Sequence, residues 1–330
     1  MDIQTLFAKP IPFNAQHFAN DLQVVAKNQA QTADVFSQKW IGYANKAKED
    51  EQQQLWDFQK EWYLRLYGFS SVEALAEFLQ QQHVVFDAGC GLGYLSDWFA
   101  SLAPETLIIG MDISEAAEEA SRRYQRPNLY FLRGDIARTP FADAVVDYVS
   151  CHAVIMHTQD PAATFAELTR VLKNAPKNGG GGQHRTIGGQ FACYVYAKKA
   201  LPRELVDDYF RTKCHDLSHK ELREMSEQLT ELGKRLQELK VEIDAPAIPL
   251  LGIKGGKIDI QRFIYWNFLK CFYNEELGLE TSIITNYDWY SPSNAKRYSE
   301  SEFKELGIAN HLQLLHFHSE EACFGARFAK

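Results

Sequence analysis

The sequence lacks the features that mark several large classes of protein. No apolar run reaches the roughly 18 residues that a membrane-spanning helix needs. Its 35 basic residues are outnumbered by 43 acidic ones, giving a net charge of −8, and this disfavours nucleic acid as a partner because phosphate binding needs clustered positive charge. The first residues, Met1 to Gln4, show neither the basic nor the apolar region of a signal peptide. We therefore expect a cytoplasmic protein without a membrane span.

Paired cysteines are absent as well. The six cysteines are scattered along the chain, and none forms a C-x-x-C pair. Close pairs are typical of zinc sites and redox motifs, and small disulfide frameworks need an oxidising compartment. We expect reduced thiols, no disulfide framework and no metal site.

What the sequence does contain is a strand followed by a glycine turn. The apolar run from Val84 ends in Asp87, and glycines then alternate at 89, 91 and 93, ahead of a helical pattern that reaches Leu102. Glycine tolerates positive φ, and its missing side chain lets a ligand approach the backbone. Strand, glycine turn and helix together predict a nucleotide-type cofactor site at the carboxyl edge of a parallel sheet.

The spacing of the glycines selects the cofactor. The dinucleotide fingerprint is G-x-G-x-x-G, whereas here the third glycine comes one residue early and Asp87 stands two residues before the first. A second strand, 107–111, ends in Asp112, whose carboxylate can accept two hydrogen bonds from a ribose diol. An NAD-dependent oxidoreductase is an alternative that this spacing disfavours.

These motifs resemble the class I S-adenosylmethionine (SAM)-dependent methyltransferases of the small-molecule type. The segment 87–93 is similar to their first motif, Asp112 to their second, and Asp135 with the residues around it to their third. The stretch 152–161 is similar to the "L-H-H-T-x-D-P" sequence of many small-molecule members. The resemblance is good over about residues 84–200 and holds only in outline at the two ends.

The resemblance implies roles for individual residues. The glycines would approach the methionine half of SAM, Asp87 its ammonium group, Asp112 its ribose, and Asp135 with Ile136 its adenine; S-adenosylhomocysteine would be the product. The full set of candidate cofactor-binding residues is Asp87, Gly89, Cys90, Gly91, Gly93, Asp112, Ile113, Asp135, Ile136 and Cys151.

The fold class expected is α/β, with a doubly wound, Rossmann-like sheet of seven strands whose last strand is antiparallel. Apolar runs alternate with helical patterns, which is typical of βαβ units. The expected strands are 84–87, 107–111, 129–133, 145–150 and 190–197, followed by a hairpin of 312–317 and 323–328. Helices are expected to begin near 92, 114, 138 and 161, and a later helix over 301–306 to be stopped by Gly307.

Four regions are expected along the chain. Residues 1–83 read as an N-terminal helical lid of two or three helices, 84–198 as the SAM-binding core, 199–295 as a helical cap or substrate insertion before the last two strands, and 296–330 as a helix and hairpin that complete the sheet. The glycine-rich stretch 174–190 reads as a surface loop, with a phosphate-cradling loop as the alternative.

Three patterns stand out in the insertion. Leucines and one methionine repeat from 222 to 239 with the spacing 3-4-3-4-3, a heptad seam on one long helix over 217–240. We expect this helix to pack on the chain's own core, with homodimerisation as the alternative. Residues 261–273 read as a helix aromatic on most sides, and 286–292 as an aromatic turn.

Histidines and aromatics supply the remaining candidates. His157 and His152 follow the fourth core strand, at the edge where open α/β sheets bind ligands, and a neutral imidazole suits proton abstraction. Each also has a structural reading, as a histidine that only packs or bonds the backbone. The candidate lining of a substrate pocket is Tyr194, Tyr196, Tyr287, Trp289 and Tyr290.

The sequence thus predicts a methyltransferase that acts on a small organic acceptor, on oxygen in preference to nitrogen. An RNA or protein methyltransferase is one alternative, since Lys198, Lys199, Arg203, Arg211 and Lys213 form a modest basic run that acids interrupt. A non-catalytic partner subunit with a SAM fold is another.

Overall fold

The computed structural model describes residues 2–176 and 188–330, and its chain forms two compact units. The first unit comprises residues 1–26, 59–197 and 296–330, and the second 27–58 and 198–295. Most of the expected loop 174–190 lies outside the described residues. Within them, no helix is both long and apolar enough to cross a membrane.

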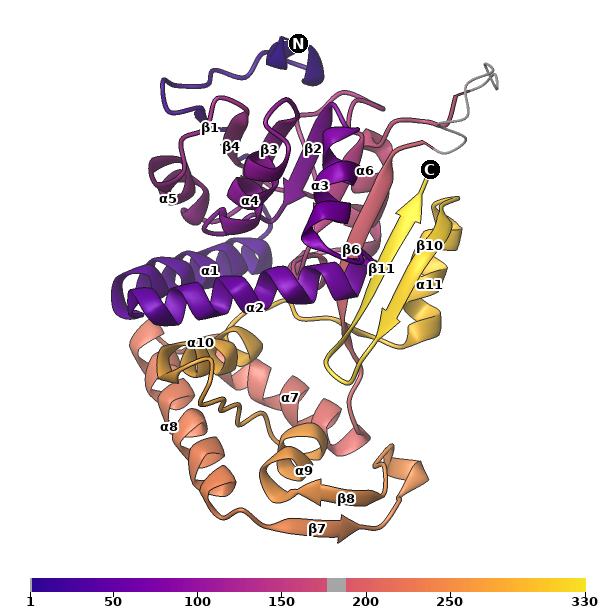
Figure 1. Cartoon of the computed structure of the whole chain (residues 1–330). Coiled ribbons are helices and arrows are strands. Elements are labelled where there is room, and N and C mark those ends of the chain that lie inside the picture. The colour runs from indigo at the N-terminus through magenta and orange to yellow at the C-terminus, as the bar shows by residue number, and fades with distance from the viewer. Residues whose placement is uncertain (1, 177–187) are drawn as a thin grey trace. The chain divides into compact units, whose positions relative to one another are not determined.

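A mixed sheet forms the middle of the first unit (Figure 1). Its order is β1-β4-β3-β2-β5-β6-β11-β10, with β9 also paired to β6. All pairings are parallel except those of β11 with β6 and with β10. The strands are β1 Phe18–Asn20, β2 Val84–Ala88, β3 Leu107–Asp112, β4 Leu129–Arg133, β5 Tyr148–Cys151, β6 Gln190–Ala197, β9 Arg297–Tyr298, β10 Gln313–Ser319 and β11 Cys323–Ala329.

The α/β class and the antiparallel closing hairpin are confirmed, but the expected count of seven strands is wrong. The described sheet has nine strands because β1 adds to the edge strand β4 and β9 adds to β6. These two strands contain three and two residues. A strand that short shows no hydrophobic alternation from which a sequence pattern could predict it.

The sheet separates two apolar layers. Along β2, Val84, Phe86 and Ala88 face one hydrophobic cluster while Val85 faces the other. Every residue of β2 is buried. A strand that is apolar on both faces is typical of a parallel sheet covered by helices on its two sides.

Helices cover the sheet as a doubly wound fold requires. Those of the first unit are the end of α2 (Glu49–Tyr67), α3 Val72–Gln80, α4 Tyr94–Leu102, α5 Ala116–Arg123, α6 Pro161–Val171 and α11 Glu300–Ala309, with 3-10 turns η1 Ile3–Leu6 and η2 Ile155–His157. Three of the expected starts, near 92, 114 and 161, lie within two residues of α4, α5 and α6.

The helix expected near 138 does not form. The segment between β4 and β5 is instead held by side chains: Asp135 Oδ1 accepts from the Ala137 amide at 2.9 Å, and Glu167 Oε1 accepts from both the amide and the hydroxyl of Thr139 at 2.9 and 2.7 Å. Short polar side chains that bond nearby amides compete with helix formation.

Helix α11 does not end at Gly307, as expected, but continues to Ala309. Gly307 has a packing role, because a Cβ placed there would lie 2.5 Å from a ring carbon of Phe328 on β11. The glycine therefore lets the helix lie close to the sheet.

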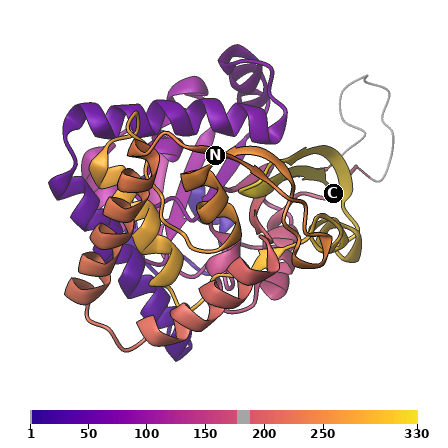
Figure 2. The same cartoon turned by 90° about the horizontal axis from the view of Figure 1, so that it is seen from below.

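The second unit is mainly helical. Besides α1 Lys27–Lys46 and the start of α2, it contains α7 Leu201–Cys214, α8 His219–Glu238, η3 Pro249–Leu251, α9 Ile260–Asn267 and α10 Leu279–Tyr290, with a hairpin of β7 Glu242–Ala245 and β8 Gly256–Asp259. In Figures 1 and 2 the indigo helix α1 runs beside the orange helix α10, although the two are far apart in sequence. An ion pair of 2.7 Å between Lys39 and Asp288 joins them.

The long helix predicted over 217–240 is confirmed as α8, but its buried face shares only Leu222 with the leucine seam. Buried positions are Leu222, Ser226, Thr230 and Gly233, whereas Leu232 is 40% exposed. A Cβ on Gly233 would lie 2.2 Å from the carbonyl oxygen of Cys271. Small residues thus allow a close approach on this face, and the helix packs against α9 and α10 as expected of a helix that covers the chain's own core.

Two further expectations in this unit are wrong. The aromatic helix expected over 261–273 ends at Asn267, and the residues expected to form an aromatic turn, 286–290, lie in α10. Asn286 is a buried helix residue whose amide nitrogen donates to Thr230 Oγ1 on α8 at 2.8 Å. Tertiary hydrogen bonding of this kind overrides the local turn preference of asparagine.

Candidate functional site

The glycine turn after β2 has the backbone that its sequence predicts. Gly89, Gly91 and Gly93 have φ of +91°, +51° and +78°. The turn is fixed to the end of β3, because the amides of Gly89 and Cys90 donate to the Met111 carbonyl at 2.7 and 3.0 Å. Glycine adopts positive φ at little cost, which suits three alternate positions of this kind.

Two of these glycines also lie where a side chain would collide. A Cβ on Gly89 would lie 2.3 Å from Cγ2 of Val154, which follows β5, and one on Gly93 would lie 2.8 Å from the Cβ of Ala120. Gly93 is the residue from which α4 begins. The turn therefore needs glycine both for its conformation and for its packing.

Asp112 closes the other side of this turn. Its Oδ2 accepts from the Gly91 amide at 2.9 Å, and its Oδ1 accepts from the amide and the hydroxyl of Ser114 at 2.8 and 2.6 Å. The carboxylate is only 8% exposed but offers about four lone-pair sites. Next to it, Ile113 is half-buried and its carbonyl accepts from Arg133 Nε at 3.5 Å. Three of the lone-pair sites of Asp112 are taken, so its carboxylate is held in place with about one acceptor site left for a further donor.

Asp87 lies at the start of the turn, deep in the sheet. It is 2% exposed and accepts from Ser96 Oγ on α4 at 2.6 Å. Burial raises the pKa of this carboxyl to about 7, with the nearby charge of Asp112 adding to the rise and the Ser96 bond opposing it. Burial likewise raises the pKa of the Cys90 thiol. A cationic group placed beside Asp87 would favour its ionised form.

The third acid follows β4. Asp135 is half-buried and caps its own turn through Ala137, while Ile136 is 5% exposed and belongs to the hydrophobic core. Asp87, Asp112 and Asp135 therefore stand at or just beyond the carboxyl ends of β2, β3 and β4, which are neighbours in the sheet. Open α/β sheets bind ligands at this edge.

The end of β5 supplies Cys151 and His152. Cys151 is fully buried opposite Cys193 of β6. His152 is 7% exposed, with Nδ1 3.0 Å from Tyr67 Oη and Nε2 3.1 Å from Gln59 Oε1. Burial lowers the pKa of this imidazole to about 3, so His152 is neutral near pH 7.

Gln59 connects the histidine with the helix after the glycine turn. Its Oε1 also accepts from the hydroxyl of Tyr94, the first residue of α4, at 3.3 Å. An oxygen can only accept, so with this amide orientation His152 carries its proton on Nε2 and accepts from Tyr67 on Nδ1. The pattern of the sequence did not reveal Gln59 or Tyr94, since the contact joins residues distant in the chain.

Aromatic rings surround the two histidines. His157 is 4% exposed, with Nε2 3.2 Å from Tyr196 Oη. The ring of Tyr196 meets that of Tyr194 edge to face at 5.9 Å, and Tyr194 in turn lies 5.7 Å from the ring of His152. The structure thus brings together four of the predicted catalytic and pocket residues in the first unit.

The other three predicted pocket residues lie on α10, within the second unit. Tyr287 Oη is 3.0 Å from His219 Nδ1, while Trp289 Nε1 and Tyr290 Oη donate to Asp207 at 2.6 and 2.7 Å. Their polar atoms therefore bond to residues of their own unit.

The donor set at the sheet edge fits SAM. The three glycines of the turn carry no side chains, and the buried carboxyls of Asp112 and Asp87 lie beside the turn, with the apolar side chain of Ile136 beyond β4. Among residues 2–176 and 188–330, no three His, Cys, Asp or Glu side chains are grouped to hold a metal ion. All six cysteines are buried.

Comparison with known proteins assigns this region to a family. The family model described as "Methyltransferase domain" matches residues 86–176. The chain is 34% identical over 109 residues to an uncharacterized methyltransferase of Schizosaccharomyces pombe, covering 30% of this chain and 39% of that protein. It is 36% identical over 90 residues to malonyl-[acyl-carrier protein] O-methyltransferase of Legionella pneumophila, covering 27% and 32%.

A third relative is a probable S-adenosylmethionine-dependent methyltransferase of Mycolicibacterium smegmatis, 39% identical over 89 residues, with 27% of this chain and 34% of that protein covered. The chain thus matches between 32% and 39% of the length of these curated relatives. Among solved structures, a SAM-dependent methyltransferase from Mesorhizobium loti aligns with a TM-score of 0.44 at 11% identity, over 79% of this chain and 97% of that one.

Proposed function

We propose that this chain, in which residues 86–176 form a class I SAM-dependent methyltransferase domain, transfers a methyl group from SAM to a small organic acceptor and releases S-adenosylhomocysteine. One observation carries the proposal above all. Three positive-φ glycines and the acids Asp87, Asp112 and Asp135 meet at adjacent strand ends, inside the part of the chain that matches the family.

Each acid has a proposed contact with SAM. Asp112 would accept from the ribose hydroxyls, Asp87 would lie near the ammonium group, and Asp135 with Ile136 would take the adenine. Cys90, Ile113 and Cys151 stay candidate neighbours of the cofactor. The start of α4 would favour the carboxylate, because helix N-termini attract anions.

SAM, when bound, supplies an electrophilic methyl group. The chain contributes alignment and a base. Alignment lowers the activation barrier by about 7–11 kcal/mol in well-oriented reactions. A general base raises the rate by roughly 10²–10⁴-fold. We propose His157 as the base that takes the acceptor's proton. The contacts of His152 with Tyr67 and Gln59, and its pKa of about 3, favour a role in positioning these side chains.

Oxygen is the acceptor atom that we favour. The Legionella relative, which matches this chain over 90 residues, is named as an O-methyltransferase. The aromatic side chains around His157 and His152, Tyr194 and Tyr196, would suit an acceptor with an apolar or ring portion.

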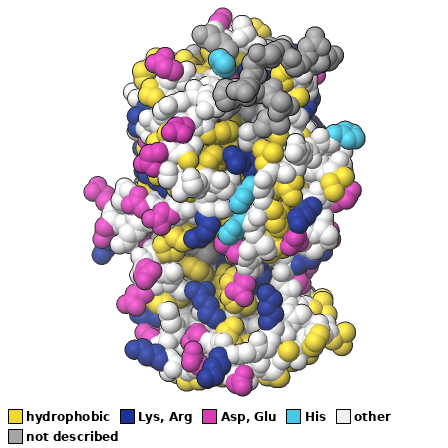
Figure 3. Space-filling view, turned by 45° about the vertical axis from the view of Figure 1, so that its right-hand side comes forward, with side chains coloured by type: hydrophobic (Ala, Val, Ile, Leu, Met, Phe, Trp, Pro, Cys, Tyr) yellow, Lys and Arg dark blue, Asp and Glu magenta, His cyan; other side chains and the backbone are white. Residues whose placement is uncertain are grey.

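Two observations weigh against an RNA acceptor. Arg203 is 1% exposed and paired with Asp207, and Arg211 is 6% exposed and paired with Asp208, so both are withdrawn from the basic run. On the face drawn in Figure 3, basic and acidic side chains are interspersed. Phosphate binding needs clustered positive charge instead.

The experiment is transfer of labelled methyl from SAM to panels of small hydroxylated aromatics and sugars, amines, RNA and protein. Turnover confined to a small hydroxylated acceptor supports the proposal. Turnover with RNA or protein only would refute the acceptor class, and SAM binding without turnover on any panel would favour a non-catalytic subunit. The variant Asp112→Ala is the control for the cofactor site.

A homodimer through α8 also belongs to this proposal. It is supported by Leu232 and Leu239, which are 40% and 60% exposed on the seam of that helix. A shift from dimer to monomer in the variant L232E/L239E, measured by sedimentation, would support it, and a monomeric wild-type protein would refute it. A cytoplasmic location is likewise proposed, in keeping with cysteines that are scattered along the sequence without a C-x-x-C pair.

A further inference from the structure

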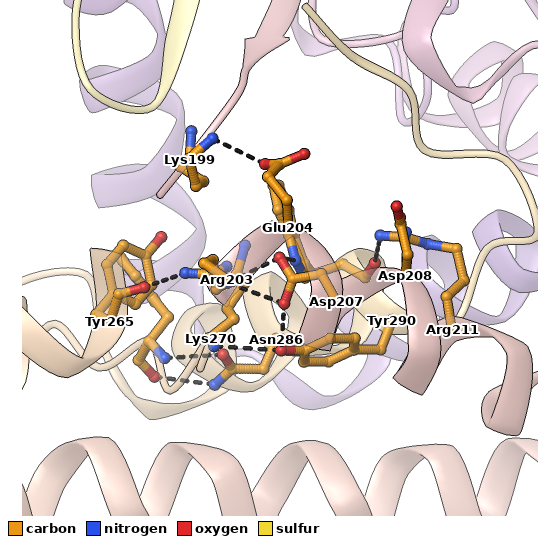
Figure 4. A network of polar contacts seen from close by, with 12 residues as sticks. Lys199, Arg203, Glu204, Asp207, Asp208, Arg211, Tyr265, Lys270, Asn286 and Tyr290 are labelled. Atoms are coloured by element: carbon orange, nitrogen blue, oxygen red, sulfur yellow. Dashed lines mark hydrogen bonds and ion pairs between the residues drawn. The ribbon is translucent and has the colours of Figure 1, made fainter. Parts of the chain in front are cut away.

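The second unit contains a buried lysine that the proposed methyl transfer does not use. Lys270 lies between α9 and α10 and is only 5% exposed. Its backbone amide donates to Tyr290 Oη at 3.2 Å, which fixes this part of the chain against α10. Figure 4 shows Lys270 within the polar network that also contains Arg203, Asp207 and Tyr290.

Asp207, a carboxylate of that network, already has three donor groups. Both oxygens of Asp207 contact Arg203 Nε, at 2.9 and 2.7 Å, and they also accept from Trp289 Nε1 and Tyr290 Oη. These contacts fill the roughly four lone-pair sites of a carboxylate. Arg203, itself buried, donates further to the carbonyl of Tyr265. Asp207 is therefore not available to Lys270.

The second carboxylate near Lys270 has another cation. Asp288 accepts from Lys39 Nζ at 2.7 Å, in a pair whose side chains are 8% and 17% exposed. The local set is thus three cationic side chains, Lys39, Arg203 and Lys270, against two carboxylates. One positive charge is left without a partner of opposite sign.

Lys270 has no hydrogen bond from its ammonium to any residue in the described part of the chain. Its Nζ lies 4.3 Å from the ring centroid of Trp289. Burial lowers the pKa of this amine to about 7; Asp288 and Asp207 oppose the fall, and Arg203 and Lys39 add to it. Nζ is not among the fully buried side-chain atoms that lack a hydrogen-bond partner, so it keeps some contact with solvent, and an ammonium there whose charge no carboxylate balances attracts an anion.

We propose that Lys270 binds the carboxylate of a small organic acid within the second unit. A single ammonium is a point charge that matches one negative charge, whereas phosphate sites in proteins usually combine several donors or a bidentate arginine. The neighbouring Arg203 and Lys39 are already paired, with Asp207 and Asp288. The ring of Trp289, itself only 3% exposed, makes the surroundings of the ammonium apolar on that side. This site is separate from the proposed methyl transfer and stands without it.

The test is a titration of the full chain with sodium benzoate, with inorganic phosphate in parallel, followed by calorimetry at pH 6 and pH 8. We expect one benzoate per chain, with a dissociation constant on the order of 1 mM or tighter. Since the acid binds the protonated amine, affinity should fall about tenfold between pH 6 and pH 8. Binding should be lost in Lys270→Met and kept in Lys254→Met, which replaces an exposed lysine.

A second measurement on the wild-type protein covers the case in which Lys270→Met does not fold. Carbon-13 NMR of labelled lysine side chains should show one ε-carbon that titrates near pH 7 and shifts to higher pH with benzoate. Benzoate binding that is unchanged in folded Lys270→Met, absence of benzoate binding to the wild type, or phosphate binding in its place would overturn the proposal.

Discussion

Gly89→Ala is the substitution that the cofactor turn should tolerate least. A non-glycine residue with left-handed backbone costs roughly 1–2 kcal/mol, and Gly89 has a φ of +91°. Its new Cβ would lie 2.3 and 2.5 Å from the two methyl carbons of Val154, and overpacking of this kind costs typically about 1–3 kcal/mol. The variant should therefore lose about 2–5 kcal/mol of unfolding free energy.

A double mutant separates the two causes. In Gly89→Ala/Val154→Ala the steric loss of unfolding free energy should disappear, because the two methyl groups are gone. The backbone loss of roughly 1–2 kcal/mol should remain. Urea unfolding of the two single variants and the double variant, compared as a double-mutant cycle, would separate the two losses. The matched control is Gly42→Ala within α1, where no atom lies within 4 Å of the added Cβ. That change should stabilise by about 0.5–1 kcal/mol. Equal urea midpoints for Gly89→Ala and wild type would refute this reasoning.

The other predictions concern titratable groups. The folded pKa of Asp87, about 7, lies above its unfolded value, so between about pH 4 and pH 7 the folded state binds more protons and stability falls as pH rises, by up to roughly 4 kcal/mol. Asp87→Asn should lack that fall in urea titrations at several pH values; a parallel fall in both proteins would contradict the assignment. Binding of SAM at pH 6 should release up to one proton from Asp87, seen as a buffer-dependent calorimetric heat, and a heat independent of buffer would argue against the ammonium contact. Replacement of His157 by asparagine should lower kcat by roughly 10²–10⁴-fold and abolish the fall of kcat toward acidic pH. The variant His152→Asn should keep that dependence of kcat on pH between pH 5 and 8. The reverse result would exchange the proposed roles.

The motifs of the sheet edge could be predicted because each is local. A strand, three alternate glycines and an acid after the next strand lie within 84–112, and the structure keeps all of them at one edge. Strand β1 could not be predicted in this way, since its three residues become a strand only by pairing with β4. The same holds for Gln59, which reaches His152 and Tyr94 through tertiary contacts alone.

Local preference also misled the prediction where packing decided the outcome. Gly307 reads as a helix stop but lies inside α11. A glycine is needed there because the ring of Phe328 occupies the space that a side chain would take. Asn286 and Ser291 read as turn residues, yet Asn286 bonds across to α8 from within α10. On α8 the leucine seam was visible, while the small residues that actually face the core carry little hydrophobic signal.

Calorimetric titration of the purified chain with SAM, with NAD in parallel and Asp112→Ala as the control, tests the central claim most directly. The account predicts micromolar SAM binding that weakens markedly in the variant, because the acceptors for the ribose are lost, and no binding of NAD. Binding of NAD, or no SAM binding to well-folded protein, would contradict the assignment of the glycine turn and of the three acids around it.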